Sequence, residues 1–291
     1  MQFNPMGRVT HRHVILCIAA LLTATTALAQ RDDLLGRSEL VLRGGGMTYL
    51  GDLNNQSALG EVRPGYGGGV RIRIDNRWSV RVEGAHGTLT ATHDWIPKRN
   101  LSFRSSLTEG ALMAEFNFRP FGAGATESRW TPYIFGGLAA FHFNPKGQYI
   151  SPRGDTTWVE LKPLCTEGQG TTAYPERRPY PLTMVSMPFG VGVKLRISKS
   201  ITVTAEHGFR RTWTDYIDDV STTYVGADLL RSEVENGTVA SQMADRSEKA
   251  NAPGIKRGDD SLNDWYSYFN VSLSISMNTL FGWMRSKKCR N

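Results

Sequence analysis

Strict alternation of apolar and polar side chains is the feature that most constrains how this chain can fold. It is clearest over 265–278, where every second residue is apolar and the intervening ones are polar. The apolar row is Trp265, Phe269, Val271, Leu273, Ile275 and Met277, with Ser267 as its one small polar member. Side chains of a β-strand point alternately to the two faces of a sheet, so this pattern predicts a strand with one apolar and one polar face.

Seven other segments show the same period of two and complete a set of eight expected strands. They lie near 39–49, 66–74, 78–90, 107–119, 131–143, 185–198 and 201–210. Strands of about 9 to 13 residues are long enough for a tilted crossing of the hydrocarbon layer of a membrane. An even number of strands is expected when both termini of the chain lie on one side of the membrane.

The connections between these segments alternate strictly between short and long. The short ones are 75–77, 120–130 and 198–200, and the long ones lie near 50–65, 91–106, 144–184 and 214–264. Outer-membrane barrels have short periplasmic turns and long extracellular loops. The sequence therefore predicts an all-β fold, an eight-stranded antiparallel transmembrane β-barrel of this kind, over 30–278.

The first 29 residues have the three parts of a secretory signal peptide. Arg8 and Arg12 form a basic start, Val14–Leu22 is an apolar stretch too short to span a bilayer, and Ala27-Leu28-Ala29 matches a signal-peptidase site. We expect cleavage after Ala29 and export to the bacterial outer membrane. Cleavage lowers the formal net charge from +7 to +5, because it removes two arginines and no acid.

No later stretch has 18 or more apolar residues, so a membrane crossing by this chain requires a closed barrel. Tryptophans lie where the two aromatic girdles of such a barrel are expected. Trp78 and Trp130 flank the short turns, and Trp95, Trp213 and Trp265 flank the long loops.

Charged residues on the polar face leave two interpretations open. The set comprises Arg43, Arg71, Arg73, Arg81, Lys194 and Arg210, with Glu83, Glu115 and Glu206. In a soluble, lipocalin-like barrel these side chains face water around an apolar interior. In a membrane barrel they fill the lumen as an ion-pair network, and Gly67, Gly69, Gly190 and Gly192 leave room for them. We expect the second arrangement, with a plugged lumen.

The longest loop and the C-terminal end carry three further predictions. Ala227–Asn236 is expected to form a short helix, with Gly237 ending it. Arg246–Asp260 has little to bury. Residues 279–291 are expected to form a basic periplasmic tail that includes Lys287, Lys288 and Arg290.

Few residues suggest metal binding or catalysis. Asp215, Asp218 and Asp219 could hold Ca²⁺ at the outer rim, although an ordinary solvated loop is the simpler interpretation. His207 could serve as a general base with these acids, but its phase places it on the lipid-facing row. We therefore expect no enzyme, and no catalytic, cofactor-binding or metal-binding residue.

The two cysteines that remain after cleavage, Cys165 and Cys289, are expected on opposite sides of the membrane and not to pair. No basic stretch is interleaved with aromatic residues in the manner of a nucleic-acid groove, so no nucleic-acid partner is expected.

Several motifs, in order along nearly the whole mature chain, resemble the PorG-like family of outer-membrane barrels. They are Tyr49–Asn54, Arg99–Ser105, Phe141–Pro145, Thr166–Gly170, Phe209–Tyr224, Ala244–Ser247, Arg257–Asp259 and Asn263–Tyr266. That family belongs to the type IX protein secretion system of the Bacteroidota. The resemblance implies a structural barrel associated with periplasmic ring proteins, a lipoprotein and its partner, and it carries over no catalytic residue.

Three functions thus remain from the sequence. The first is a structural anchor for a protein secretion machine. The second is a barrel that binds a small ligand or forms a channel, which requires an open lumen. The third is a rim enzyme, a hydrolase or acyltransferase that would use His207 and Asp215.

Overall fold

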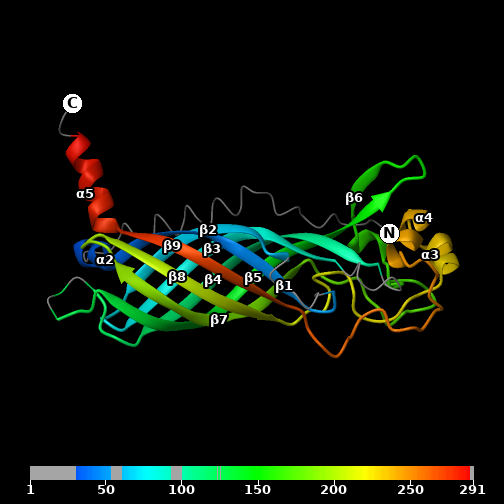
Figure 1. The fold of residues 1–291 in the computed structure, drawn as a ribbon, viewed down its shortest axis with the longest axis horizontal. Helices are drawn as coiled ribbons and strands as arrows, with labels where there is room; N and C mark the ends of the chain where they lie inside the picture. Colours follow the sequence, from blue (N-terminus) through cyan, green and yellow to red (C-terminus); the bar gives the residue numbers. More distant parts are fainter. Residues whose placement is uncertain (1–30, 54–60, 93–99, 123, 125, 289–291) are drawn as a thin grey trace, which may run out of the picture.

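Eight antiparallel strands close into a barrel in the computed structural model (Figure 1), which describes residues 31–53, 61–92, 100–122, 124 and 126–288. The expected signal peptide, Trp95 and Cys289 lie outside the described residues. The strands of the barrel are β1 (Ser38–Leu50), β2 (Arg63–Arg73), β3 (Trp78–Thr92), β4 (Ser102–Asn117), β5 (Trp130–Ile150), β7 (Thr183–Arg196), β8 (Ile201–Thr212) and β9 (Trp265–Ser276). Among the described residues, no helix is both long and apolar enough to cross a bilayer.

Each strand pairs with its neighbour along the chain, and the first pairs with the last. The order runs β4-β3-β2-β1-β9-β8-β7-β5, and pairing of β4 with β5 closes the ring. In the pair of the first strand, β1, with the last, β9, Arg43 lies opposite Ser272. Closure leaves no unpaired edge along the barrel wall, as a strand structure in hydrocarbon requires. The predicted fold is therefore confirmed.

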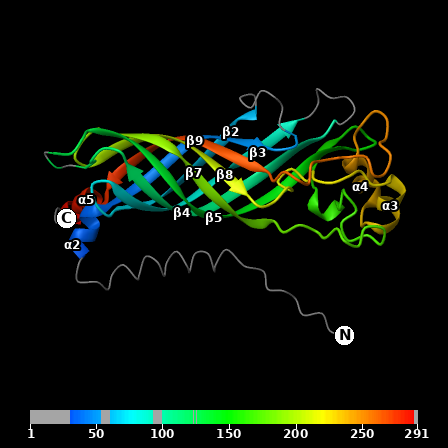
Figure 2. The same cartoon turned by 90° about the horizontal axis from the view of Figure 1, so that it is seen from below.

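The two ends of the barrel differ sharply (Figures 1 and 2). At the short-turn end lie the tight connections, together with α2 (Arg31–Arg37) and α5 (Met277–Lys288). In the turn after β2, the Oδ1 atom of Asp75 accepts hydrogen bonds from the backbone N–H groups of Arg77 and Trp78, at 2.6 and 2.7 Å. At the long-loop end lie β6 (Thr156–Glu160), the 3₁₀ turn η2 (Lys162–Leu164), α3 (Ala227–Glu233) and α4 (Gly237–Ala244).

A broad apolar surface surrounds the barrel wall. Its exposed members include Leu42, Val82, Leu112, Ile134, Leu138, Val185, Phe189, Val191, Val193, Leu195, Phe269, Val271 and Leu273. Trp78 and Trp130 lie at its short-turn edge, and Trp213 lies exposed just beyond β8. An apolar band flanked by aromatic side chains is the lipid-facing surface of a transmembrane barrel. The charged row faces inward, so the soluble, lipocalin-like alternative is wrong.

The polarity of both faces exchanges along β4 and β5. Toward the short-turn end, Leu112 and Leu138 point outward and are 56% and 68% exposed, while Glu115 is buried inside. Farther along the same strands, Phe103 and Phe143 are buried inside. The exposed residues there are polar: Arg104, Ser106, Thr108 and His142. The strands therefore leave the hydrocarbon and continue as the wall of a water-surrounded domain with an ordinary apolar core.

This second domain, the cap, is formed by the far ends of the strands and by the long connections 144–182 and 213–264. Its core contains Leu107, Phe141, Leu161, Leu164, Tyr180, Ile217, Val220, Leu230, Ala240 and Met243. Helix α4 packs against β5 at Gly147, where an added Cβ would collide with the side chain of Met243. Burial of apolar side chains on water-surrounded strands explains why the long connections fold onto the barrel.

Several connections are more structured than the sequence indicates. Strand β3 extends to Thr92, and β4 already begins at Ser102. Strand β5 continues to Ile150 and pairs with the additional strand β6. Helix α3 already ends at Glu233, and Gly237 is the first residue of a second helix, α4, so the prediction that Gly237 ends the helix is wrong. Residues 277–288 form helix α5 where a simple tail was expected. The prediction that Arg246–Asp260 has little to bury is wrong, because Arg257 is only 2% exposed.

A charge placed on the lipid-facing band tests the membrane assignment. We expect Val191→Arg to lower the free energy of unfolding by about 2–4 kcal/mol, because the guanidinium would have to enter hydrocarbon. The matched control is Ser106→Arg, on the same outward side but on the polar part of β4. Urea titration in lipid vesicles measures both variants, and equal losses would contradict the assignment.

Candidate functional site

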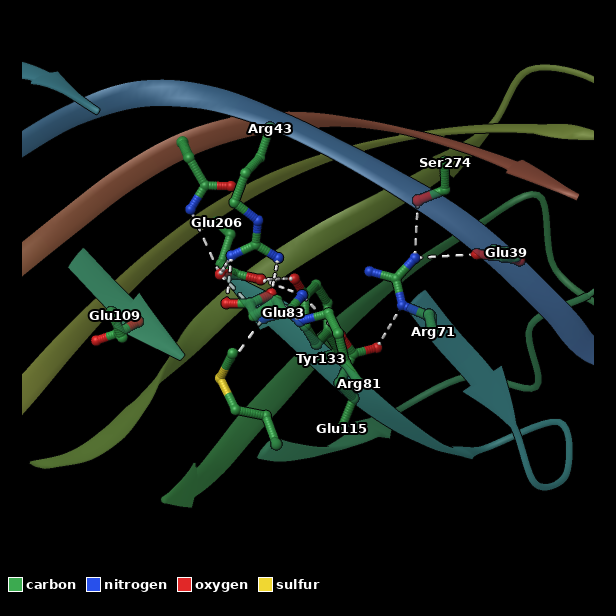
Figure 3. A network of polar contacts seen from close by, with 12 residues as sticks. Glu39, Arg43, Arg71, Arg81, Glu83, Glu109, Glu115, Tyr133, Glu206 and Ser274 are labelled. Atoms are coloured by element: carbon green, nitrogen blue, oxygen red, sulfur yellow. Dashed lines mark hydrogen bonds and ion pairs between the residues drawn. The ribbon is translucent and has the colours of Figure 1, made fainter. Parts of the chain in front are cut away.

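The lumen is filled by a network of buried ion pairs centred on Arg81 (Figure 3). The guanidinium of Arg81 lies 2.7 Å from a carboxylate oxygen of Glu115, 2.8 Å from one of Glu206 and 2.7 Å from one of Glu83. Arg43 pairs with Glu83 and donates a further hydrogen bond of 2.7 Å to it. These side chains come from β1, β3, β4 and β8, so the network ties opposite walls of the barrel together.

A second part of the network extends toward the short-turn end. The Nε atom of Arg71 donates to Glu115 at 2.8 Å, and its Nη1 atom lies 3.0 Å from Glu39. Lys194 donates to Glu115 at 2.6 Å and to Asn117 at 2.9 Å. Glu115 therefore accepts from three cations, those of Arg71, Arg81 and Lys194.

The charges of the network balance. The cations of Arg43, Arg71, Arg81 and Lys194 face the carboxylates of Glu39, Glu83, Glu115 and Glu206. Nearer the cap, Arg210 forms a separate pair with Glu109 at 3.3 Å, and the hydroxyl of Tyr266 donates to the same carboxylate. Buried charges persist only when they are paired, and each of these charges has a partner of opposite sign. The Nε atom of Arg43 and the Nη2 atom of Arg71 are buried without a hydrogen-bond partner among the described residues.

Sequence reasoning found most of this network but missed three members. Arg43, Arg71, Arg81, Lys194, Arg210, Glu83, Glu115 and Glu206 all lie inside, as predicted. Arg73 is half-buried at the mouth. The missed members are Glu39, Glu109 and Tyr133, whose hydroxyl donates to Glu206 at 2.5 Å. Glu109 was identifiable, because it is in phase with Glu115 on β4.

Little space remains inside the barrel. At the short-turn end, the cavity bounded by Glu39, Arg71 and Lys194 measures about 10 Å³, roughly the room that one water molecule needs. Glycines make the filling possible, as predicted. A Cβ added at Gly192 would lie 2.6 Å from the ring of Tyr133, and one at Gly190 would lie 2.7 Å from the ring of Phe135.

Buried polar contacts centred on Glu167 hold the cap together. Its carboxylate accepts from the backbone N–H groups of Ser221 and Thr222, at 2.9 and 3.0 Å, and from the Thr222 hydroxyl at 2.7 Å. The guanidinium of Arg257 lies 2.9 Å from the same carboxylate. One side chain thus joins three segments that are far apart in the sequence.

The acids expected at the outer rim are buried within the cap. Asp215, Asp218 and Asp219 are 8%, 1% and 1% exposed, so the interpretation as a solvated loop start is wrong. Asp219 accepts from the hydroxyls of Thr166 and Tyr180, at 2.5 and 2.7 Å. Burial raises the pKa of Asp219 to about 6, although the nearby guanidinium of Arg257 opposes the shift. Within the described ranges, no three His, Cys, Asp or Glu side chains are grouped so that they could hold a metal ion.

His207 and the acids are not brought together. The imidazole points outward from β8 and lies between the rings of Phe209 and Phe269, with ring centroids 4.8 and 6.4 Å away. The carboxyls of Asp215 and Asp218 are enclosed in the cap. The expected lipid-facing position of His207 is confirmed.

An open cleft of about 390 Å³ lies beside the cap, lined by Pro163, Pro179, Leu182 and Cys165 among others. Cys165 is a free thiol, and burial raises its pKa. Its lining also includes Lys162 and Glu160, whose carboxylate accepts a hydrogen bond of 2.9 Å from the amide of Asn144.

The surface of the short-turn end is basic. Five cationic side chains are exposed there: Arg37, Arg77, Arg119, Arg129 and Lys199. The acids in the same turns are Asp75 and Glu127, and both are engaged in capping backbone N–H groups. We call these five cations the basic rim.

The known proteins to which this chain is similar are found among solved structures. No protein-family model matches the sequence, and no curated protein matches it either. Among solved structures, the chain is similar to neisserial surface protein A, with 10% identity, a TM-score of 0.40, and coverage of 82% of this chain and 96% of that one. It is also similar to the attachment invasion locus protein of Yersinia pestis, with 8% identity, a TM-score of 0.38 and coverage of 82% and 96%. A third is the outer membrane protein OprG of Pseudomonas aeruginosa, with 11% identity, a TM-score of 0.34 and coverage of 84% and 99%.

Removing one charge from the network tests its contribution to stability. We expect Glu115→Gln to lower the free energy of unfolding by roughly 3–5 kcal/mol, because three buried cations would lose their shared carboxylate. Glu39→Gln is the control, since its side chain is 22% exposed and its one ion pair among the described residues is with Arg71. Urea unfolding in lipid vesicles should give a much smaller loss for the control. Equal losses would show that the lumen network is not what stabilises the barrel.

Proposed function

We infer that this chain is a structural component of the bacterial outer membrane that anchors periplasmic proteins of a secretion machine and has no catalytic role. In this orientation the short-turn end faces the periplasm and the cap lies outside the cell, as the short and long connections of such barrels are arranged. The signal peptide expected from the sequence supports export.

The observation that carries this inference is the filled lumen. Charges from six strands cross it, and the cavity at its short-turn end measures about 10 Å³. A barrel of eight strands is just wide enough for side chains to fill. Because the interior is occupied, activity must reside at the two ends or on the outer wall.

The basic rim supports a protein partner at the periplasmic end. Five exposed cations surround the short turns, and the acids nearby are held by backbone groups. Charge complementarity steers association and fixes the orientation of a partner, so this surface suits a protein with an acidic face. Lys287, Lys288 and Arg290 add further positive charge to the C-terminal segment.

The resemblance to PorG-like barrels supplies the identity of the partners in this proposal. It indicates the periplasmic ring of the type IX secretion system of the Bacteroidota, in which a lipoprotein and its partner surround the translocon. The motif that resembles the family most specifically, Phe209–Tyr224, runs from the end of β8 into the cap. This part of the cap contains the buried acids Asp215, Asp218 and Asp219.

Affinity purification tests the anchoring role. The tagged chain, solubilised from outer membranes, should recover a periplasmic lipoprotein and its partner. Reversing two rim charges with Arg129→Glu and Lys199→Glu should reduce this recovery by about tenfold, because rim charges set association. Quantitative mass spectrometry of the eluate measures the change.

The control pair is Arg153→Glu with Arg178→Glu, which reverses two exposed charges at the long-loop end. This pair should recover the partners as the unmodified chain does. Equal recovery from both double variants would contradict the proposed docking surface. A clean deletion of the gene that leaves protein export intact would contradict the anchoring function.

A channel or a ligand-binding barrel is the second candidate, and the open cleft of about 390 Å³ beside the cap is the observation that favours ligand binding. Planar-bilayer recording distinguishes conduction from anchoring. We expect no conductance steps from the purified, folded chain, because paired charges obstruct the lumen. Reproducible conductance steps whose size changes in Arg81→Ala would establish a channel. They would also contradict the filled lumen on which the anchoring proposal rests.

A further inference from the structure

A tyrosine hydroxyl joins two buried carboxyls where the cap meets the barrel. The hydroxyl of Tyr49, at the end of β1, lies 2.7 Å from the Oδ2 atom of Asp218 and 2.5 Å from the Oδ1 atom of Asp264. All three side chains are at most 1% exposed. Asp264 also accepts from the backbone N–H of Ile217, and Asp218 accepts from that of Val220, both at 2.9 Å.

The number of protons held by Tyr49, Asp218 and Asp264 decides how many of these contacts are hydrogen bonds. A tyrosine hydroxyl has a single proton and can donate it to one acceptor. The second close contact is a hydrogen bond only if one of the carboxyls carries a proton and donates it to the hydroxyl oxygen. Both contacts are therefore hydrogen bonds when Asp218 and Asp264 share one proton in the folded cap.

The charges around this pair favour the same conclusion. Six carboxyls lie together in the cap: Asp52, Glu167, Asp215, Asp218, Asp219 and Asp264. Among the described groups that face them, the cation is Arg257, which is 2.9 Å from Glu167 and 3.8 Å from Asp219. Arg177 lies beside this set and donates to the backbone oxygens of Glu167 and Thr223. Full ionisation would leave several buried negative charges uncompensated.

Asp215 provides an independent sign that the cluster binds a proton. Its Oδ2 atom is buried and has no hydrogen-bond partner among the described residues. The residue is 8% exposed. Burial raises the pKa of Asp215 to about 8; a hydrogen bond with Ser221 opposes the shift, and the neighbouring charges of Asp218 and Asp52 add to it. Burial likewise raises the pKa of Asp218 and of Asp264.

We propose that the cap is a pH-responsive element, in which the proton shared by Asp218, Tyr49 and Asp264 keeps the segment 214–224 docked on β1. Loss of this proton places two negative carboxylates against one hydroxyl and releases the segment. The device belongs to the cap and operates whether or not the periplasmic end anchors a partner.

The sign of the pH dependence follows from the raised pKa values. A carboxyl in the opened cap titrates near its ordinary pKa of about 4, whereas in the closed cap it retains its proton to a higher pH. Closure is therefore most stable below about pH 4 and weakens as the pH rises toward about 8. Each proton released on opening increases the opening constant by up to tenfold per pH unit within this window.

Hydrogen exchange on the full chain in lipid vesicles between pH 5 and pH 8 measures this dependence. After correction for the intrinsic exchange rate, protection of the amides of Ile217 and Val220 should fall as the pH rises. Protection of the barrel strands should stay constant. Protection in 214–224 that does not change with pH would overturn the proposal.

Asp218→Asn is the decisive variant, because asparagine reproduces the protonated state. Its Oδ1 can still accept from Val220, its Nδ2 can donate to the hydroxyl of Tyr49, and that hydroxyl can then donate to Asp264. In the unmodified chain, release of the shared proton makes protection fall by up to tenfold for each pH unit. In Asp218→Asn this part of the pH dependence should be absent. Asp228→Asn, at a fully exposed aspartate of α3, should leave the slope unchanged.

An unchanged slope in Asp218→Asn would overturn the proposal. Infrared spectroscopy of the unmodified chain provides a test that needs no variant to fold. A protonated-carboxyl band should be present at pH 6 and should decrease toward pH 9. Absence of that band at pH 6 would also overturn the proposal.

Discussion

Neutralisation of buried charge inside a closed wall is the constraint on which the structure depends. The outer surface of the barrel meets hydrocarbon, so every polar group of the spanning segment must find its partner inside. Arg81 meets three carboxylates, and Glu115 meets three cations. Removing one member leaves a buried charge without its partner. The network therefore fixes the shape of the lumen and obstructs it at the same time.

Beyond the membrane, the strands have the opposite arrangement, with apolar side chains inside and polar side chains outside. Along β4, buried Glu115 is succeeded toward the long-loop end by buried Leu107 and Phe103, while the outward residues change from Leu112 to Arg104. Water outside the wall favours apolar residues inside it. The long connections cover this core, and their own polar groups meet at Glu167, Asp219 and Arg257. A rigid, charge-rich cap is the consequence.

These two regions divide the molecule into parts with different tasks. The sealed spanning segment gives a fixed position in the membrane, and the basic rim offers a surface at the short-turn end. The cap holds an excess of carboxyls around Tyr49, Asp218 and Asp264, which couples its closure to protons. The proposed anchoring surface and the proposed pH-responsive cap thus lie at opposite ends of the molecule.

The sequence by itself determined the strands of the barrel, their number and the set of charged side chains on one face, because alternation with a period of two is a local property of each segment. Alternation left open which face is inside, and the tertiary structure placed the charged face inward. It also indicated which connections are short. Only the tertiary structure decided that Glu109 and Tyr133 join the lumen contacts, since these depend on the register between strands. The burial of Asp215, Asp218 and Asp219 was equally beyond a local pattern. A run of acids resembles a solvated loop until distant segments that contain Tyr49, Glu167 and Arg257 close around it.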